Sequence, residues 1–132
     1  MRARTCLILL ACALACGCHR AKSTDELIGD LNSDKEADRI KAIRLLPQHK
    51  GDAAKVIPAL IDSLKDKKND ELRWSAAIGL GYFGEEAKEA IPALQEALRD
   101  KDARVREGAA VALSRIDPSK FQAPTNKSRG KK

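Results

Sequence analysis

Apolar residues recur along the middle of the chain with the three- to four-residue spacing of amphipathic helices, as Ile40, Ile43 and Leu46 do. No segment alternates apolar and polar residues with period two, and aromatic residues make up only 3 % of the chain, so strands have no support. The pattern predicts three antiparallel helix pairs. The helices are expected at about residues 24–31, 35–46, 52–65, 69–82, 87–99 (or 91–99) and 102–116.

Start and stop signals support these helices. Ser23 with Glu26 three residues later forms a capping box, which predicts the start of the first helix. Pro47 is expected to end the second helix, and Gly84 to close the fourth. Pro58 fits the first turn of the third helix, where a missing N–H has no intrahelical partner to lose.

Two copies of Ile-Pro-Ala-Leu, at residues 57–60 and 91–94, begin a longer pattern that repeats after 33–34 residues. Each copy is followed by a leucine, an aspartate and then an aliphatic-Arg-x-x-Ala-Ala-x-x-Leu segment, at 72–80 and 105–113. A period in the thirties indicates one helix-pair unit stacked on copies of itself. The predicted fold class is therefore all-α, an α-solenoid of about three antiparallel helix pairs. Such stacks present surfaces and seldom carry out chemistry.

Small, apolar and basic residues recur at fixed positions of the three units. Alanine lets neighbouring helices approach closely and leucine fills the space between them. The equivalent residues are Ala42, Ala76 and Ala109; Leu46, Leu80 and Leu113; and Arg39, Arg73 and Arg106. Asp70 and Asp102 precede their arginines by three and four residues, so we expect each pair to meet along its own helix.

The first 17 residues differ from the rest of the chain. Arg2 and Arg4 precede an apolar stretch at 6–15, which is typical of a secretory signal peptide. The stretch is shorter than the roughly 20 apolar residues that a membrane-spanning helix needs. All four cysteines lie at or before residue 18, so the body of the chain can hold no disulfide and no thiolate metal site.

Residues 14–18, Leu-Ala-Cys-Gly-Cys, resemble the lipobox of bacterial lipoproteins. The resemblance implies that Cys18 is acylated and becomes the new N-terminus, with Cys16 as the rival position. A plain signal cleavage that leaves Cys18 free stays open. Two or more acyl chains anchor a protein stably, at about 0.8 kcal/mol per buried CH₂. We therefore expect a signal peptide at 1–17, a short tether at 18–23 and a location at the bacterial cell envelope, periplasmic or on the outer surface.

The positive charge of the chain is concentrated near its C-terminus. The formal net charge is +6, and 119–132 holds five basic residues and no acidic one. We expect a repeat domain at 24–118 and a disordered basic tail at 119–132, with Phe121 folding back on the last helix. A nearly neutral body offers no basic groove, so nucleic acid is excluded as the expected partner.

Nothing in the sequence predicts an enzyme, a cofactor or a metal site. His19 lies beside the lipidation site, and His49 is expected to be a solvent-exposed loop residue without a second ligand at a known spacing. The glycines at 79–84 mimic GxGxxG but lie inside and at the end of a predicted helix, without the preceding strand that a dinucleotide site requires. They are expected to permit close helix packing instead.

The repeated motifs resemble those of the HEAT-repeat family, in the short variant named after phycobiliprotein lyases. The motifs that carry the resemblance lie at 91–113 and 33–34 residues earlier, and it covers about 25–118. The first unit departs from the pattern, with Asp38 where an aliphatic residue is usual and Pro47 in place of the closing glycine. The resemblance implies a right-handed solenoid whose second helices line a concave face, structural Asp–Arg ladders and a role in protein–protein contact.

One stripe of residues departs from the polar surface expected in such repeats. Trp74, Ile78 and Tyr82 are spaced four residues apart on one helix face, and Ile40 and Val111 hold the matching places in the first and third units. An exposed apolar strip with Trp and Tyr is a mark of a protein-binding surface. The alternative interpretation is that Trp74 packs as core under a neighbouring repeat.

The sequence therefore predicts an exported, lipid-anchored adaptor that binds a protein. The short tether favours a partner that is itself membrane-bound. Two alternatives stay open. The chain resembles proteins that attach or remove bilin chromophores, which implies an accessory or enzymatic role. Solenoids also stack end to end, so a purely structural self-assembly is the other alternative, and the oligomeric state stays open.

Overall fold

The computed structural model describes residues 21–122, in which every regular element is helical. The expected all-α fold is confirmed. Along the chain the elements are α1 (Thr24–Asp30), α2 (Glu36–Leu45), η1 (Leu46–Gln48), η2 (Lys50–Asp52), α3 (Ala53–Leu64), α4 (Asp70–Phe83), η3 (Gly84–Ala90), α5 (Ile91–Ala97) and α6 (Ala103–Ile116), where η marks a 3₁₀-helix.

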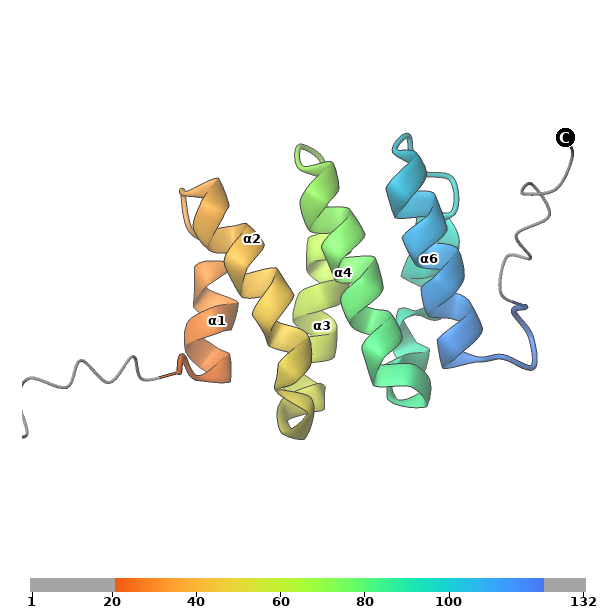
Figure 1. Cartoon of the computed structure of the whole chain (residues 1–132), viewed down its shortest axis with the longest axis horizontal. Coiled ribbons are helices and arrows are strands. Elements are labelled where there is room, and N and C mark those ends of the chain that lie inside the picture. The colour runs from red at the N-terminus through yellow and green to blue at the C-terminus, as the bar shows by residue number, and fades with distance from the viewer. Residues whose placement is uncertain (1–20, 123–132) are drawn as a thin grey trace, which may run out of the picture.

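The helices form two layers in a stack of three pairs. Figure 1 shows α2, α4 and α6 side by side in one layer, with α1 and α3 behind them. Helix α4 is the centre of the stack, because it packs against α2, α3 and α6. None of the described helices is long and apolar enough to cross a membrane.

The recurring small and apolar residues form the core. The equivalent alanines and leucines at six positions are all buried: Ala42, Ala76, Ala109, Leu46, Leu80 and Leu113. Helices α4 and α6 approach so closely that a Cβ atom on Gly81 would lie 3.2 Å from the Cα of Ala112. The expected packing role of this glycine is confirmed.

The helix boundaries agree with the sequence signals, with one exception. The Ser23–Glu26 capping box is formed, and Gly84 ends α4 with a φ of 54°, in the left-handed region that favours glycine. The expectation for Pro58 was wrong, because α3 begins at Ala53 and Pro58 lies inside the helix. The start at Ala53 agrees with the expected helix at 52–65. Burial of Val56 and Ile57 in the turn before Pro58 offsets the backbone hydrogen bond that proline cannot donate.

The recurring arginines tie each helix pair to its own turn. Nη1 of Arg39 donates to the carbonyl oxygen of Ser33 at 2.8 Å, and Nη1 of Arg73 donates to that of Asp66 at 3.0 Å. In the third unit, Nη1 of Arg106 donates to the carbonyl of Asp100 at 2.7 Å. Because these carbonyls belong to the turns between paired helices, each arginine stabilises the geometry of its own turn.

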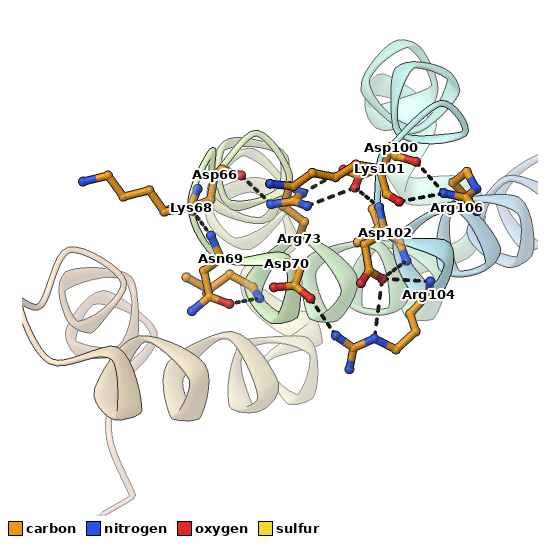
Figure 2. Close-up of polar contacts among 12 residues, drawn as sticks. Asp66, Lys68, Asn69, Asp70, Arg73, Asp100, Lys101, Asp102, Arg104 and Arg106 are labelled. Carbon is orange, nitrogen blue, oxygen red and sulfur yellow. Dashed lines mark hydrogen bonds and ion pairs between the residues drawn. The ribbon is translucent and has the colours of Figure 1, made fainter.

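Arg73 also joins the second unit to the third. Its Nε donates to Oδ2 of Asp100 at 2.7 Å and its Nη2 to Oδ1 at 2.9 Å, and both side chains are largely buried (Figure 2). The expected pairings along one helix, Asp70 with Arg73 and Asp102 with Arg106, were both wrong. Arg73 faces the interface between repeats, whereas Asp70 pairs with Nη2 of Arg104 in the next unit at 2.7 Å. Between the second and third units, the Asp–Arg pairs therefore join neighbouring repeats.

The charges in the turns are stabilised in their ionised forms. The hydrogen bonds from Arg73 hold the pKa of the Asp100 carboxyl below its usual range. Burial by itself would raise the pKa of Asp66, but the backbone N–H groups of Asn69 and Lys68 donate to this carboxylate and lower the pKa overall.

Replacing Asp100 with alanine is expected to lower the free energy of unfolding at pH 7 by about 3 kcal/mol, because it leaves the buried guanidinium of Arg73 unpaired. Since the folded pKa of Asp100 lies below its unfolded value of about 3.9, its contribution is present above about pH 4 and is lost as the pH falls through the folded value. Urea unfolding followed by circular dichroism at pH 7 and pH 3 measures both effects.

The matched control is Asp34→Ala, which removes an exposed aspartate from the turn between α1 and α2. It should change stability by less than about 0.5 kcal/mol. Equal losses in the two variants, or a loss for Asp100→Ala that is undiminished at pH 3, would contradict the assigned role of the ion pair.

Candidate protein-binding surface

A groove of about 370 Å³ lies between α2 and α4. We call it the α2–α4 groove. Its walls are Ile43 and Arg44 of α2, Pro47 and Gln48 of the following 3₁₀ turn, and Trp74, Ser75, Ile78, Gly79 and Tyr82 of α4. Three of the five residues predicted from the sequence as a protein-binding strip therefore meet in one hollow.

Tyr82 is the most accessible of these three predicted residues. It is 56 % exposed, whereas Trp74 and Ile78 are half-buried. The guanidinium carbon of Arg115 lies 5.7 Å from the centre of the Tyr82 ring. This cation–π contact holds an exposed ring at the edge of the groove, where a partner can cover it without first having to order it.

Trp74 contributes to both the groove and the core. A Cβ atom added to Gly108 of α6 would lie 3.2 Å from Cδ1 of Trp74 and 3.6 Å from Cδ1 of Ile78. The indole therefore packs where α6 approaches α4, while another part of it lines the α2–α4 groove. Trp74 thus packs as core on its α6 side, and its role at a protein interface stays a prediction.

Ile40 and Val111 lie on either side of the groove without lining it. Ile40 is half-buried and borders a separate hollow on α2, with Ala37, Lys41, Arg44 and Leu45. Val111 is half-buried on α6. Ile40 lies on α2 and Val111 on α6, on the two sides of α4. The apolar strip expected across the three helices is therefore not continuous with the groove.

Sequence reasoning missed the α2 wall and the basic rim of the groove. Arg44 pairs with Glu71, and the guanidinium of Arg104 lies 5.9 Å from the centre of the Trp74 ring while it pairs with Asp70. Arg115 has no carboxylate partner within residues 21–122. These contacts join residues about 30 positions apart in neighbouring repeats. The spacing along one helix does not reveal them.

The remaining candidates for chemistry lie elsewhere or outside the described residues. His49 is half-buried rather than solvent-exposed as expected, with Nδ1 3.0 Å from Oγ1 of Thr24, so it joins α1 to the turn before α3. Within residues 21–122 no group of three or more His, Cys, Asp or Glu residues is placed to hold a metal ion. Cys16, Cys18 and the signal peptide expected at 1–17 lie outside the described residues, as does most of the basic tail. Phe121 does pack against the core, as expected.

Comparison with known proteins agrees with this geometry. A family model for HEAT repeats matches residues 57–124, about half of the chain. The chain belongs to the HEAT-repeat family. No curated protein matches it significantly.

A solved structure with the same arrangement is the complex of CpcE and CpcF of phycocyanin lyase from Nostoc sp. PCC7120. The similarity has a TM-score of 0.67 and 28 % sequence identity, and covers 74 % of this chain and 38 % of that chain. This HEAT-repeat chain thus spans well under half the length of that relative. The expected family and solenoid architecture are both confirmed.

Trp74 and Tyr82 are expected to differ in their effect on stability. Trp74→Ala should lower the free energy of unfolding by about 2 kcal/mol, because it opens a cavity where α4 meets α6. Tyr82→Ala should cost less than about 1 kcal/mol, because more than half of the residue is already in water. Urea unfolding of both variants tests this difference, and a loss for Tyr82→Ala as large as that for Trp74→Ala would contradict it.

Proposed function

We propose that this HEAT-repeat protein is an exported, lipid-anchored adaptor that binds another protein at the bacterial cell envelope, through the α2–α4 groove. The observation that carries the proposal is the groove itself, with the exposed Tyr82 held at its edge by Arg115. The proposed role is binding without catalysis.

The chemistry of the groove suits a protein partner. A volume of about 370 Å³ accommodates one or two large apolar side chains, and Tyr and Trp anchors contribute much of the binding energy of protein interfaces. Arg44, Arg104 and Arg115 surround the apolar surface. Because Arg44 and Arg104 are already paired with acidic residues of the described chain, Arg115 is the member of this trio best placed to meet a carboxylate of the partner.

The family supports an interaction role. HEAT repeats stack into surfaces that other proteins cover. The similar solved structure is itself a complex of two chains, CpcE and CpcF. This chain covers 38 % of that relative, so the proposal takes from it only the general idea of association between proteins.

The alternative function is an accessory or enzymatic role on bilin chromophores, which the similarity to a phycocyanin lyase complex favours. Incubating the purified protein with bilin and recording the visible spectrum separates the two functions. A stoichiometric absorbance shift that Tyr82→Ala abolishes would favour the bilin role, whereas an unchanged spectrum would favour the adaptor.

The proposed location at the envelope rests on the sequence before residue 20. A tether of six residues from Cys18 to Ser23 reaches at most about 20 Å when extended, at about 3.5 Å per residue. Acylation of Cys18 would hold α1 beside the membrane, since α1 begins at Thr24. A partner that is itself bound to the membrane would then be within reach of the groove.

Tyr82→Ala is expected to weaken the partner complex about thirtyfold, because an aromatic anchor at an interface contributes about 2 kcal/mol. Crosslinked affinity capture from intact cells, comparing the native chain with the variant, measures the loss. Gln95→Ala, a substitution on α5 away from the groove, is the matched control and should capture as the native chain does. Equal capture by the native chain and Tyr82→Ala would place the binding surface elsewhere.

Replacing Cys18 with serine is expected to abolish both acylation and membrane association, whereas Cys16→Ser should retain them. Metabolic labelling with a clickable fatty acid, followed by membrane fractionation, tests both variants. Loss of label with Cys16→Ser alone would move the lipidation site to Cys16. Absence of label from the native chain would overturn the lipid anchor while leaving the groove proposal intact.

A further inference from the structure

The charged residues of the turns within the second and third helix pairs are separated by depth. In each turn an aspartate lies between two basic residues, as Lys65-Asp66-Lys67 and as Arg99-Asp100-Lys101. Both aspartates are half-buried, whereas the four basic residues beside them are exposed. The body of the chain is nearly neutral overall, but these two turns present positive charge to solvent.

Hydrogen bonds within the turns hold the two aspartates in place. Oδ1 of Asp66 accepts from the backbone N–H of Lys68 at 2.8 Å, and from that of Asn69 at 2.7 Å. Oδ1 of Asp100 accepts from the N–H of Asp102 at 2.8 Å, and the same carboxylate is bound by Arg73 (Figure 2). Because both carboxylates are engaged in this way, they form no ion pair with the basic residues beside them.

The four basic residues line one open hollow of about 810 Å³ between the second and third turns. We call it the basic hollow. Its lining also includes three apolar residues, Leu64, Ala93 and Ala97. Of the lining residues within 21–122, Glu96 is the one acidic residue that is exposed. The hollow thus combines an apolar part with a rim of exposed cations.

None of the four basic side chains forms an ion pair with another residue in the described range 21–122. Like charges gathered around a concave surface repel one another and concentrate a positive potential inside it. An anionic ligand would relieve that repulsion and would be attracted into the hollow. The basic hollow is therefore a candidate site for an anion.

The turn structure itself does not require these basic residues. In the first helix pair, Oγ of Ser33 accepts from the backbone N–H of Lys35, as Oδ1 of Asp66 does from that of Lys68. Ser33 is flanked by Asn32 and Asp34, so neither neighbouring position is basic there. The basic pairs are confined to the two turns that share the hollow.

The parts of the chain outside the described residues cannot supply the anion from a side chain. Residues 1–20 and 123–132 contain no Asp or Glu. The occupant is therefore expected to come from another molecule.

The size and position of the basic hollow favour a protein segment as that occupant. A volume of about 810 Å³ is more than a single carboxylate or phosphate group can fill, and the apolar lining suits a side chain between the charges. Figure 1 shows the second and third turns at the upper edge of the stack, and the start of α1 at the lower edge. The proposed lipid anchor precedes α1, so it would hold the opposite edge beside the membrane.

We infer that the basic hollow binds an acidic peptide segment of another protein, in which carboxylates flank an apolar residue. The carboxylates pair with the exposed basic side chains of both turns, and the apolar side chain lies against Leu64 and Ala97. No residue lines both this hollow and the α2–α4 groove, so the site is additional to the proposed adaptor surface.

Fluorescence anisotropy on the full chain, purified in an uncharged detergent, tests the inference. The probe is a short labelled peptide of glutamates around a central leucine. Lys67→Glu/Lys101→Glu should weaken its binding by about tenfold or more, because two attractive charges become repulsive. Lys35→Glu/Lys50→Glu is the matched control, with the same change in net charge at exposed positions outside the hollow, and should weaken binding by less than about twofold.

Changes in the peptide test the two parts of the hollow separately. Replacing the glutamates with glutamine should abolish binding. Replacing the leucine with serine should weaken it about fivefold, because apolar surface is then no longer buried. Added salt should weaken binding of the glutamate peptide, since the attraction is between charges near the surface. Circular dichroism should show that both double variants keep their helical content.

The other occupants are distinguished in the same experiment. Binding to phosphatidylglycerol vesicles that Lys67→Glu/Lys101→Glu reduces, without binding of the peptide, would assign the hollow to a membrane surface and overturn the inference. A mass that rises with concentration in the native chain but not in this variant would assign it to a second copy, with the same consequence. Absence of peptide binding, or equal affinity of the native chain and this variant, would also overturn it.

Discussion

Arg73 is enclosed between two turns that belong to different repeats, and its guanidinium is hydrogen-bonded to both. It donates to the backbone of the Asp66 turn behind it and to the carboxylate of Asp100 ahead of it. A planar, forked donor satisfies both acceptors only when the repeats keep one distance and one rotation. This constraint helps to fix the position of α6 relative to α4. Trp74, which packs against Gly108 of α6, is positioned by the same contact between the two helices.

The same packing couples stability to the proposed binding surface. Trp74 fills the space above Gly108 on α6 and also lines the α2–α4 groove. Tyr82, two turns further along α4, is mostly exposed and is held at the groove edge by Arg115. Along α4, side-chain exposure therefore increases from Trp74 to Tyr82. A partner can contact the accessible end of this helix without disturbing the stack.

Much of the fold was predictable because the repeats encode local structure. The capping box at Ser23 and the glycine that ends α4 each depend on neighbouring residues alone. The repeat of 33–34 residues is visible in the sequence itself. The errors concern longer distances. Asp70 was assigned to Arg73 by helical spacing, but burial directs Arg73 to the next repeat, and Pro58 was placed in a first turn although α3 begins at Ala53. The α2 wall of the groove and the burial of His49 depend on tertiary contacts that spacing does not encode.

Hydroxyl-radical footprinting of Tyr82 tests the central claim most directly, because its readout is the same whichever protein covers the groove. Oxidation of Tyr82 would be compared between intact cells and the purified chain, normalised to that of a peptide from α1. We expect Tyr82 to be strongly protected from oxidation in cells. This protection should disappear when the complex is dissociated by detergent and salt. Equal oxidation of Tyr82 in cells and in the purified protein would contradict the claim that the α2–α4 groove is a binding surface.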